Sequence, residues 1–129
     1  MMELKVGLTN EVSEEVTHNR TAESMGSGLL PVYATPAMIA LMENCCCYSV
    51  APYLEPGQGT VGIAVNIRHV SATVEGRKVR VCSELKAIDG RKLTFSVTAY
   101  DEAGVIGEGE HERFVIDSAR FMEKAKGKA

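Results

Sequence analysis

Residues 35–50 read Thr-Pro-Ala-Met-Ile-Ala-Leu-Met-Glu-Asn-Cys-Cys-Cys-Tyr-Ser-Val, and this stretch decides the fold class. Thr35 followed by Pro36 predicts a helix start, because threonine caps free backbone N–H groups and proline fits the first helical turn. The helix is expected to run to about Val50, since Pro52 follows and cannot continue it. Apolar or small residues occur on nearly every side of this helix, which predicts that other structure encloses it.

Glu43 is the only charged residue in this helix. An ionised carboxylate in apolar surroundings is costly unless it is paired or protonated, so we expect Glu43 to be buried and to have a specific role. Burial by itself favours the neutral acid form of such a side chain.

Downstream of the helix, apolar residues recur with a period of two, which is typical of strands with one buried face. Turn signals at Glu75-Gly76, Asp89-Gly90 and Ala103-Gly104 separate the runs and predict an antiparallel meander. The runs are Val61 to Ile67, Val79 to Leu85, Leu93 to Val97 and Val105 to Ile116. A sheet with one apolar face and an apolar helix bury each other if the sheet curls around the helix. The sequence therefore predicts an α+β fold, an antiparallel β-sheet curled around a long central α-helix.

The two ends of the chain carry weaker signals. Leu4 to Asn10 and Val12 to Thr17 are compatible with short extended pieces. Residues 118–129 form a basic, helix-compatible tail that is expected to fray, although Phe121 and Met122 within it can dock on the core.

Composition and length limit the function classes. A chain of 129 residues suits one domain, residues 1–129, and its 45% hydrophobic and 24% charged residues are typical of a globular protein. A net charge of −3 argues against a nucleic-acid binder. The sequence shows neither a signal-peptide pattern nor an apolar stretch of roughly 20 residues, so no membrane association is expected.

The four cysteines are Cys45, Cys46, Cys47 and the distant Cys82. Three consecutive helical side chains point in different directions, which suits neither a disulfide framework nor a tetrahedral metal site. We therefore predict free thiols in a cytoplasmic protein and no metal ion.

His69 follows the first of the strand-like runs. Successive strand residues face opposite sides of a sheet, and the apolar residues from Val61 to Ile67 are odd-numbered, as is His69. Without a bulge, His69 faces the helix that carries Glu43. This predicts that Glu43 and His69 act as a coupled pair.

Thr35 lies at the positive end of the helix dipole, where a developing negative charge on oxygen is stabilised. Glu43 follows eight residues later, which places it about 12 Å further along the helix axis. A direct contact between the two is not expected, so substrate or His69 must bridge them.

One set of residues carries a family resemblance: Thr35-Pro36-Ala37-Met38 leads to Glu43, His69 follows 26 positions later, and Gly62 lies seven positions before that histidine. This pattern resembles the fluoroacetyl-coenzyme A thioesterase-like branch of the hotdog superfamily. The resemblance extends from the Gly26-Ser27-Gly28 loop to the segment Gly109 to Phe114. It implies hydrolysis of a small acyl-coenzyme A thioester, with Thr35, Glu43 and His69 as the catalytic residues and the Gly62 backbone beside the acyl group. It also implies a homodimer with sheets joined edge to edge and active sites near the subunit interface. Coenzyme A enters as part of the substrate, and no further cofactor is implied.

Two mechanisms are compatible with these residues, because thioester hydrolysis needs a nucleophile, a proton shuttle and donors for the oxyanion. In the first, Thr35 attacks with His69 as base and forms an acyl-threonine. In the second, Glu43 attacks or activates water while Thr35 and Gly62 position the carbonyl.

The adenosine diphosphate tail of coenzyme A requires a basic rim, for which Arg113, Arg77 and Lys78 are candidates for substrate binding. His111 and Glu112 are adjacent in a strand and face opposite sides, so His111 is interpreted as structural or interfacial.

Two alternative functions remain open, since one fold hosts several activities. The first is a hydratase or dehydratase, in which His69 and a carboxylate exchange protons with an unsaturated acyl chain. The second is a non-catalytic acyl-CoA-binding module. The order and spacing of Thr35, Glu43 and His69 favour the thioesterase. The Gly26-Ser27-Gly28 loop is compatible with a hinge at the substrate entrance or with a simple turn.

Overall fold

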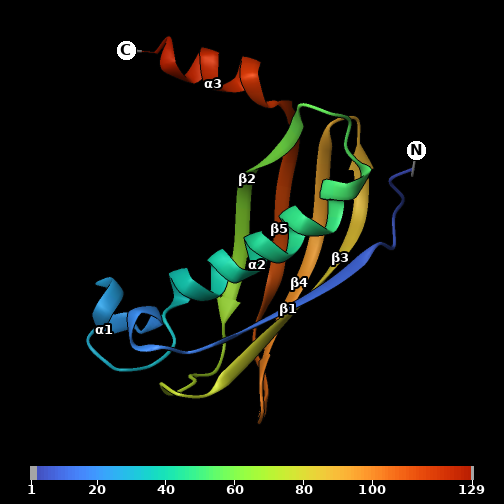
Figure 1. Cartoon of the computed structure of the whole chain (residues 1–129). Helices are drawn as coiled ribbons and strands as arrows, with labels where there is room; N and C mark the ends of the chain where they lie inside the picture. The colour runs from blue at the N-terminus through green and yellow to red at the C-terminus, as the bar shows by residue number, and fades with distance from the viewer. Residues whose placement is uncertain (1–2, 129) are drawn as a thin grey trace.

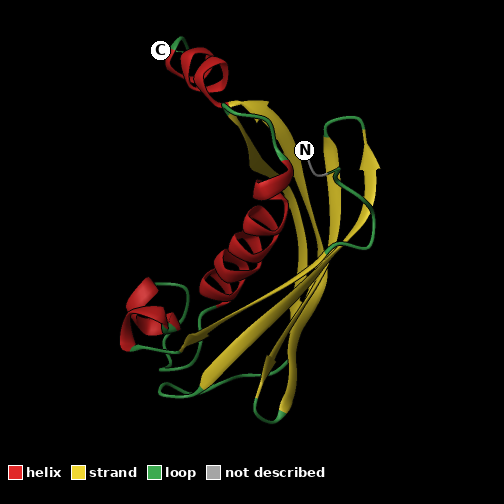
Figure 2. Ribbon diagram, turned by 45° about the vertical axis from the view of Figure 1, so that its right-hand side comes forward, coloured by secondary structure: helices red, strands yellow, loops and turns green. Residues whose placement is uncertain are grey.

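The computed structural model describes residues 3–128, which form one antiparallel sheet curved around a long helix (Figures 1 and 2). The strands are β1 (Thr9–Glu15), β2 (Gln58–His69), β3 (Lys78–Asp89), β4 (Lys92–Asp101) and β5 (Gly104–Asp117). The α-helices are α1 (Ala22–Met25), α2 (Thr35–Val50) and α3 (Ser118–Lys126), and short 3-10 turns occupy His18–Arg20 and Ala51–Tyr53. The predicted α+β arrangement, an antiparallel sheet curled around a central helix, is confirmed.

The order of the strands is β1-β3-β4-β5-β2, so the predicted meander is correct only for β3, β4 and β5. The turns at Asp89-Gly90 and Ala103-Gly104 close these two hairpins, as predicted. Glu75-Gly76 does not close a hairpin, because β1 occupies the free side of β3 and β2 pairs with β5 instead. Strand β2 is consequently an edge strand.

Helix α2 packs on the concave face of the sheet with one side only. Its buried residues recur every three or four positions: Ala37, Met38, Leu41, Met42, Cys45, Cys46, Ser49 and Val50. They contact a core contributed by β3, β4 and β5, which includes Val81, Leu85, Phe95 and Ile106. The prediction that structure encloses this helix on all sides is wrong, since Ala40, Asn44 and Tyr48 are exposed. The small and aromatic residues on its outer side concealed the helical period.

Gly107 in β5 allows α2 to approach the sheet closely. A Cβ atom at this position would lie 2.5 Å from Sδ of Met38, whose side chain is fully buried. The missing side chain therefore fixes the depth at which the N-terminal half of α2 lies against the sheet.

Both ends of the described chain differ in part from expectation. The N-terminal segment forms the single strand β1 rather than two extended pieces. The tail forms helix α3, whose N-cap Asp117 accepts a hydrogen bond from the backbone of Arg120 at 3.0 Å. Phe121 and Met122 are 40% and 50% exposed, so the predicted docking on this chain is wrong, and α3 projects away from the sheet (Figure 1). The tail's last residue, Ala129, lies outside the described residues.

Gly109 is expected to be required for the pairing of β5 with β2. A Cβ atom there would overlap the backbone carbonyl oxygen of Asn66 and lie 2.9 Å from Cα of Ile67. Gly109→Ala is therefore expected to reduce the free energy of unfolding by about 2 to 3 kcal/mol, measured by urea denaturation. Gly127→Ala is the matched control, because its Cβ would meet nothing closer than 3.5 Å. Equal unfolding midpoints for the two variants would contradict the prediction.

Candidate active site

Thr35 and His69 form a direct pair at the N-terminal end of α2. Thr35 Oγ1 lies 2.8 Å from His69 Nδ1. The N-cap of α2 is Ala34, which makes no side-chain cap hydrogen bond, so the prediction that Thr35 caps the helix is wrong. The helix begins one residue earlier than expected, and the hydroxyl of Thr35 is left available to His69. We call these two residues the Thr35 pair.

A bulge decides which face of β2 carries His69. The register between β2 and β5 shifts between Gly62 and Ala64. Before the shift, Val61 pairs with Phe114 on the outer face of the sheet. After the shift, Ile67 pairs with Gly109 on the face that carries the helix. His69 faces the helix, as predicted, but it does not share that face with Val61. The expected unbroken alternation is therefore wrong, although its conclusion for His69 is right.

His69 is set to be neutral near physiological pH. Its burial lowers the pKa of the imidazole, and the backbone of Ser71 opposes this only in part. Nε2 of His69 is buried and, within residues 3–128, has no hydrogen-bond partner. In the tautomer that carries its proton on Nε2, Nδ1 accepts the proton of Thr35 Oγ1. The pair thus has the arrangement of a nucleophile and its base.

Glu43 lies two helical turns away from this pair and has a different partner. Its Oε2 atom is 3.7 Å from Nη1 of Arg113, and 42% of its side chain is exposed. The expectation of a buried Glu43 is therefore wrong. Within residues 3–128 no hydrogen bond joins Glu43 to His69, so the single chain does not form the predicted coupled pair.

Gly62 is the point on which Glu43, His111 and Arg113 converge. A Cβ atom at Gly62 would lie 2.7 Å from Glu43 Oε2, 3.1 Å from His111 Cε1 and 3.4 Å from Arg113 Nη1. The structure thus brings together Glu43 and the two predicted substrate-binding residues, Gly62 and Arg113. We call Glu43, Gly62, His111 and Arg113 the Glu43 cluster.

Arg113 is held within this cluster and not on a basic rim. It is 6% exposed, and it donates from Nε to Thr60 Oγ1 at 2.8 Å and from Nη2 to the Thr60 carbonyl at 2.9 Å. Thr60 was missed by sequence reasoning. The only signal for it was a hydroxyl residue two positions before Gly62 in an otherwise apolar run.

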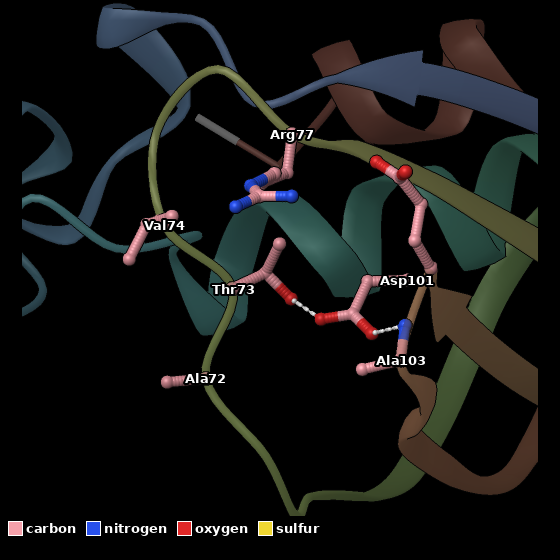
Figure 3. Close-up of a pocket in the computed structure, with 7 residues that line it drawn as sticks. Ala72, Thr73, Val74, Arg77, Asp101 and Ala103 are labelled. Atoms are coloured by element: carbon pink, nitrogen blue, oxygen red, sulfur yellow. Dashed lines mark hydrogen bonds between the residues drawn. The ribbon is translucent and has the colours of Figure 1, made fainter.

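The Thr35 pair opens into a surface pocket of about 300 Å³. Its lining includes Ser27, which places the Gly26-Ser27-Gly28 loop beside the pair, with Gly26 as the left-handed C-cap of α1. Ala72 is shared with an adjacent pocket of about 390 Å³ (Figure 3). Arg77 extends over that second pocket, opposite Asp101, whose carboxylate accepts hydrogen bonds from Thr73 and Ala103. Arg77 thus stays a candidate for the coenzyme A tail.

The four cysteines are free in the structure. Burial raises the pKa of Cys46 to about 12, which makes its thiol a poor nucleophile. Across residues 3–128, no group of three or more His, Cys, Asp or Glu side chains is arranged to hold a metal ion. In the same part of the chain, no helix has the length and apolar character needed to cross a membrane.

Comparison with known proteins gives consistent matches. A family model described as fluoroacetyl-CoA-specific thioesterase matches residues 16–119. The fluoroacetyl-CoA thioesterase of Streptantibioticus cattleyicolor is 44% identical over 97 residues, which cover 75% of this chain and 70% of that protein. The solved structure of the fluoroacetyl-CoA thioesterase FlK matches with a TM-score of 0.93 at 36% identity, covering 99% of each chain. A thioesterase-superfamily protein from Thermus thermophilus matches with a TM-score of 0.88 at 29% identity, covering 98% of this chain and 93% of that one.

Proposed function

The chain belongs to the fluoroacetyl-CoA-specific thioesterase family, and from this premise we propose that Thr35, Glu43 and His69 catalyse its reaction while Gly62 and Arg113 hold the acyl group. It adopts the hotdog fold and hydrolyses acyl-coenzyme A thioesters. The observation that carries the proposal is the 2.8 Å contact between Thr35 Oγ1 and His69 Nδ1 at the mouth of a pocket.

In the proposed mechanism, Thr35 Oγ1 attacks the thioester carbonyl while His69 Nδ1 takes the hydroxyl proton. The carbon–sulfur bond breaks, and His69 returns the proton to the departing thiolate of coenzyme A. Water then attacks the acyl-threonine, His69 takes its proton, and the free acid leaves as Thr35 regains its hydrogen. The positive end of the α2 dipole favours the oxyanion formed in each half-reaction.

The Glu43 cluster is proposed to bind the acyl end of the substrate and to supply a carboxylate that orients or activates the hydrolytic water. The Arg113 guanidinium, fixed by Thr60, presents Nη1 toward Gly62, where a side chain has no space. The crowding at Gly62 favours a small acyl group.

The separation of the Glu43 cluster from the Thr35 pair is explained if two copies complete each other's sites. We propose a homodimer that joins through the edge strand β2, on which Ile63 and Val65 are 50% and 49% exposed. Two-fold antiparallel pairing of this edge places the Gly62 half of one strand opposite the His69 half of the other. Each site then combines the Thr35 pair of one protomer with the Glu43 cluster of its partner.

A cytoplasmic location is also proposed. Four free cysteines, of which Cys45 and Cys46 are buried, are compatible with a reducing compartment.

The test of the proposed function is a panel of acyl-coenzyme A substrates in which release of free thiol is measured. Acetyl-CoA, fluoroacetyl-CoA and longer saturated acyl-CoA thioesters are compared, and turnover of the short ones is expected. Hydration of crotonyl-CoA without thiol release would instead assign these residues to a hydratase, and tight binding of every thioester without turnover would assign them to a binding module.

The pH dependence of hydrolysis is expected to reflect His69. The imidazole must be neutral to accept the proton of Thr35, so kcat/KM falls as pH decreases through the pKa of His69. Burial lowers that pKa from its ordinary value of about 6.5, so the loss of activity is expected below pH 6.5. The profile of kcat/KM between about pH 4.5 and 8 measures this. A half-loss of kcat/KM at or above pH 6.5 would contradict the assignment.

A further inference from the structure

His111 is a buried histidine whose two ring nitrogens have different partners. It is 1% exposed, with Nδ1 2.8 Å from the carbonyl oxygen of Ala64 and Nε2 3.1 Å from Nη1 of Arg113. A carbonyl oxygen only accepts and a guanidinium only donates, so Nδ1 carries the hydrogen and Nε2 offers its lone pair. The contacts therefore select one neutral tautomer.

The surroundings of His111 keep it in this form. Burial lowers the pKa of His111, and the positive charge of Arg113 acts in the same direction. The ring of Phe95 in β4 stacks on it at 6.4 Å between centroids, and β2 contributes the Ala64 carbonyl. The charged groups near His111 are Arg113 and Glu112 on its own strand and Glu43 on α2. The carboxylates of Glu43 and Glu112 oppose the lowering of the His111 pKa.

The lone pair of His111 completes the fixation of Arg113. Thr60 accepts from Nε and Nη2 of the guanidinium and leaves Nη1 without a partner on that side. Nη1 is within hydrogen-bond distance of His111 Nε2 and lies 3.7 Å from Glu43 Oε2. The planar guanidinium is thus held at three of its nitrogens, and its remaining donor capacity at Nη1 is directed toward Glu43 and Gly62.

We propose that His111 is a positioning residue, whose Nε2 lone pair holds Nη1 of Arg113 against Glu43 at the acyl-binding end of the site. The inference rests on the proposed function of Arg113 and Glu43. His111 contacts neither the Thr35 pair nor its pocket, so it acts through Arg113.

A double-mutant cycle tests this coupling. His111→Leu removes the acceptor, His111→Gln retains an acceptor at about the same distance from the backbone, and His111→Asn is polar but too short to reach Arg113. His111→Leu and His111→Asn are each expected to lower kcat/KM by about 10- to 100-fold, and His111→Gln by less than about threefold. In an Arg113→Met background, His111→Leu is expected to cause no further loss. Losses that multiply in the double variant overturn the proposal. His18→Gln is the control, because the side chain of this histidine is 68% exposed and its ion-pair partner is Glu75, not Arg113.

A second measurement is independent of turnover. In the wild-type protein and in His111→Gln, nuclear magnetic resonance is expected to show separate signals for the two Nη groups of Arg113, because the guanidinium cannot rotate. In His111→Leu and His111→Asn the Nη1 signal is expected to shift and broaden, while Thr60 still holds Nε and Nη2. An Nη1 signal that is unchanged in these last two variants overturns the proposal even if no thioester is hydrolysed. If the wild-type protein releases no thiol from any acyl-coenzyme A in the substrate panel, by contrast, that result contradicts only the proposed function.

Discussion

Replacing His69 with alanine is expected to lower kcat by about 10²- to 10⁴-fold, the range that general acid–base catalysis contributes. His69 Nδ1 is within hydrogen-bond distance of the Thr35 hydroxyl, and the substitution removes this acceptor for the proton of Oγ1. The first half-reaction is the step affected, so the fast release of one thiol equivalent per active site in pre-steady-state assays is expected to disappear. The fold is expected to persist, because the change also removes a buried Nε2 that has no hydrogen-bond partner among residues 3–128.

The control for this prediction is His18→Ala, since the side chain of His18 is 68% exposed and its ring lies 3.4 Å from Glu75, outside the Thr35 pair. Its kcat is expected to equal that of the wild type, and both variants should unfold at similar urea concentrations. Turnover of His69→Ala within tenfold of the wild type, with the fold intact, would remove His69 from the chemistry.

The elements of this fold were predictable because they are specified locally. Pro36 and Pro52 mark the two ends of α2, and the period-two runs after them identify the four strands that follow. These signals are the same whichever way the elements are later arranged. The position of β2 was not predictable in this way. It depends on β1 pairing with β3, a contact between segments some 70 residues apart that no local pattern records.

The candidate site residues could be singled out from the sequence, but their contacts with one another could not. Glu43 stood out as the one charge in an apolar helix, yet its partner Arg113 lies 70 positions further along the chain, in strand β5. The bulge after Gly62 shifts the register between β2 and β5 by one residue. The alternation of apolar residues along β2 cannot reveal this shift, because it depends on the partner strand. The helix rise did predict that Thr35 and Glu43 do not meet, because that distance is set by one element alone.

Glu43→Gln is expected to lower kcat/KM by about 10²- to 10³-fold, as found when one electrostatic or proton-transfer group is removed from an active site. Glutamine fills the same volume near Arg113, so the loss reports the carboxylate and not the packing. Thr35→Ala is expected to be similarly inactive, because the proposed nucleophile is absent. Both variants are expected to fold and dimerise like the wild type, which sedimentation and urea unfolding can verify.

Mixing these two inactive variants distinguishes a site shared between protomers from one held within a single chain. If the Thr35 pair of one protomer works with Glu43 of its partner, a mixed dimer of Thr35→Ala and Glu43→Gln contains one site in which every group is intact. Random mixing makes half of the dimers mixed, so about a quarter of the wild-type activity is expected to return. A mixture of Thr35→Ala with His69→Ala is the matched control, because both changes affect the same half-site and no intact site can form. Recovery in the first mixture and none in the second is the expected result. An inactive first mixture, with mixed dimers shown to be present, would mean that Glu43 does not act across the β2 edge.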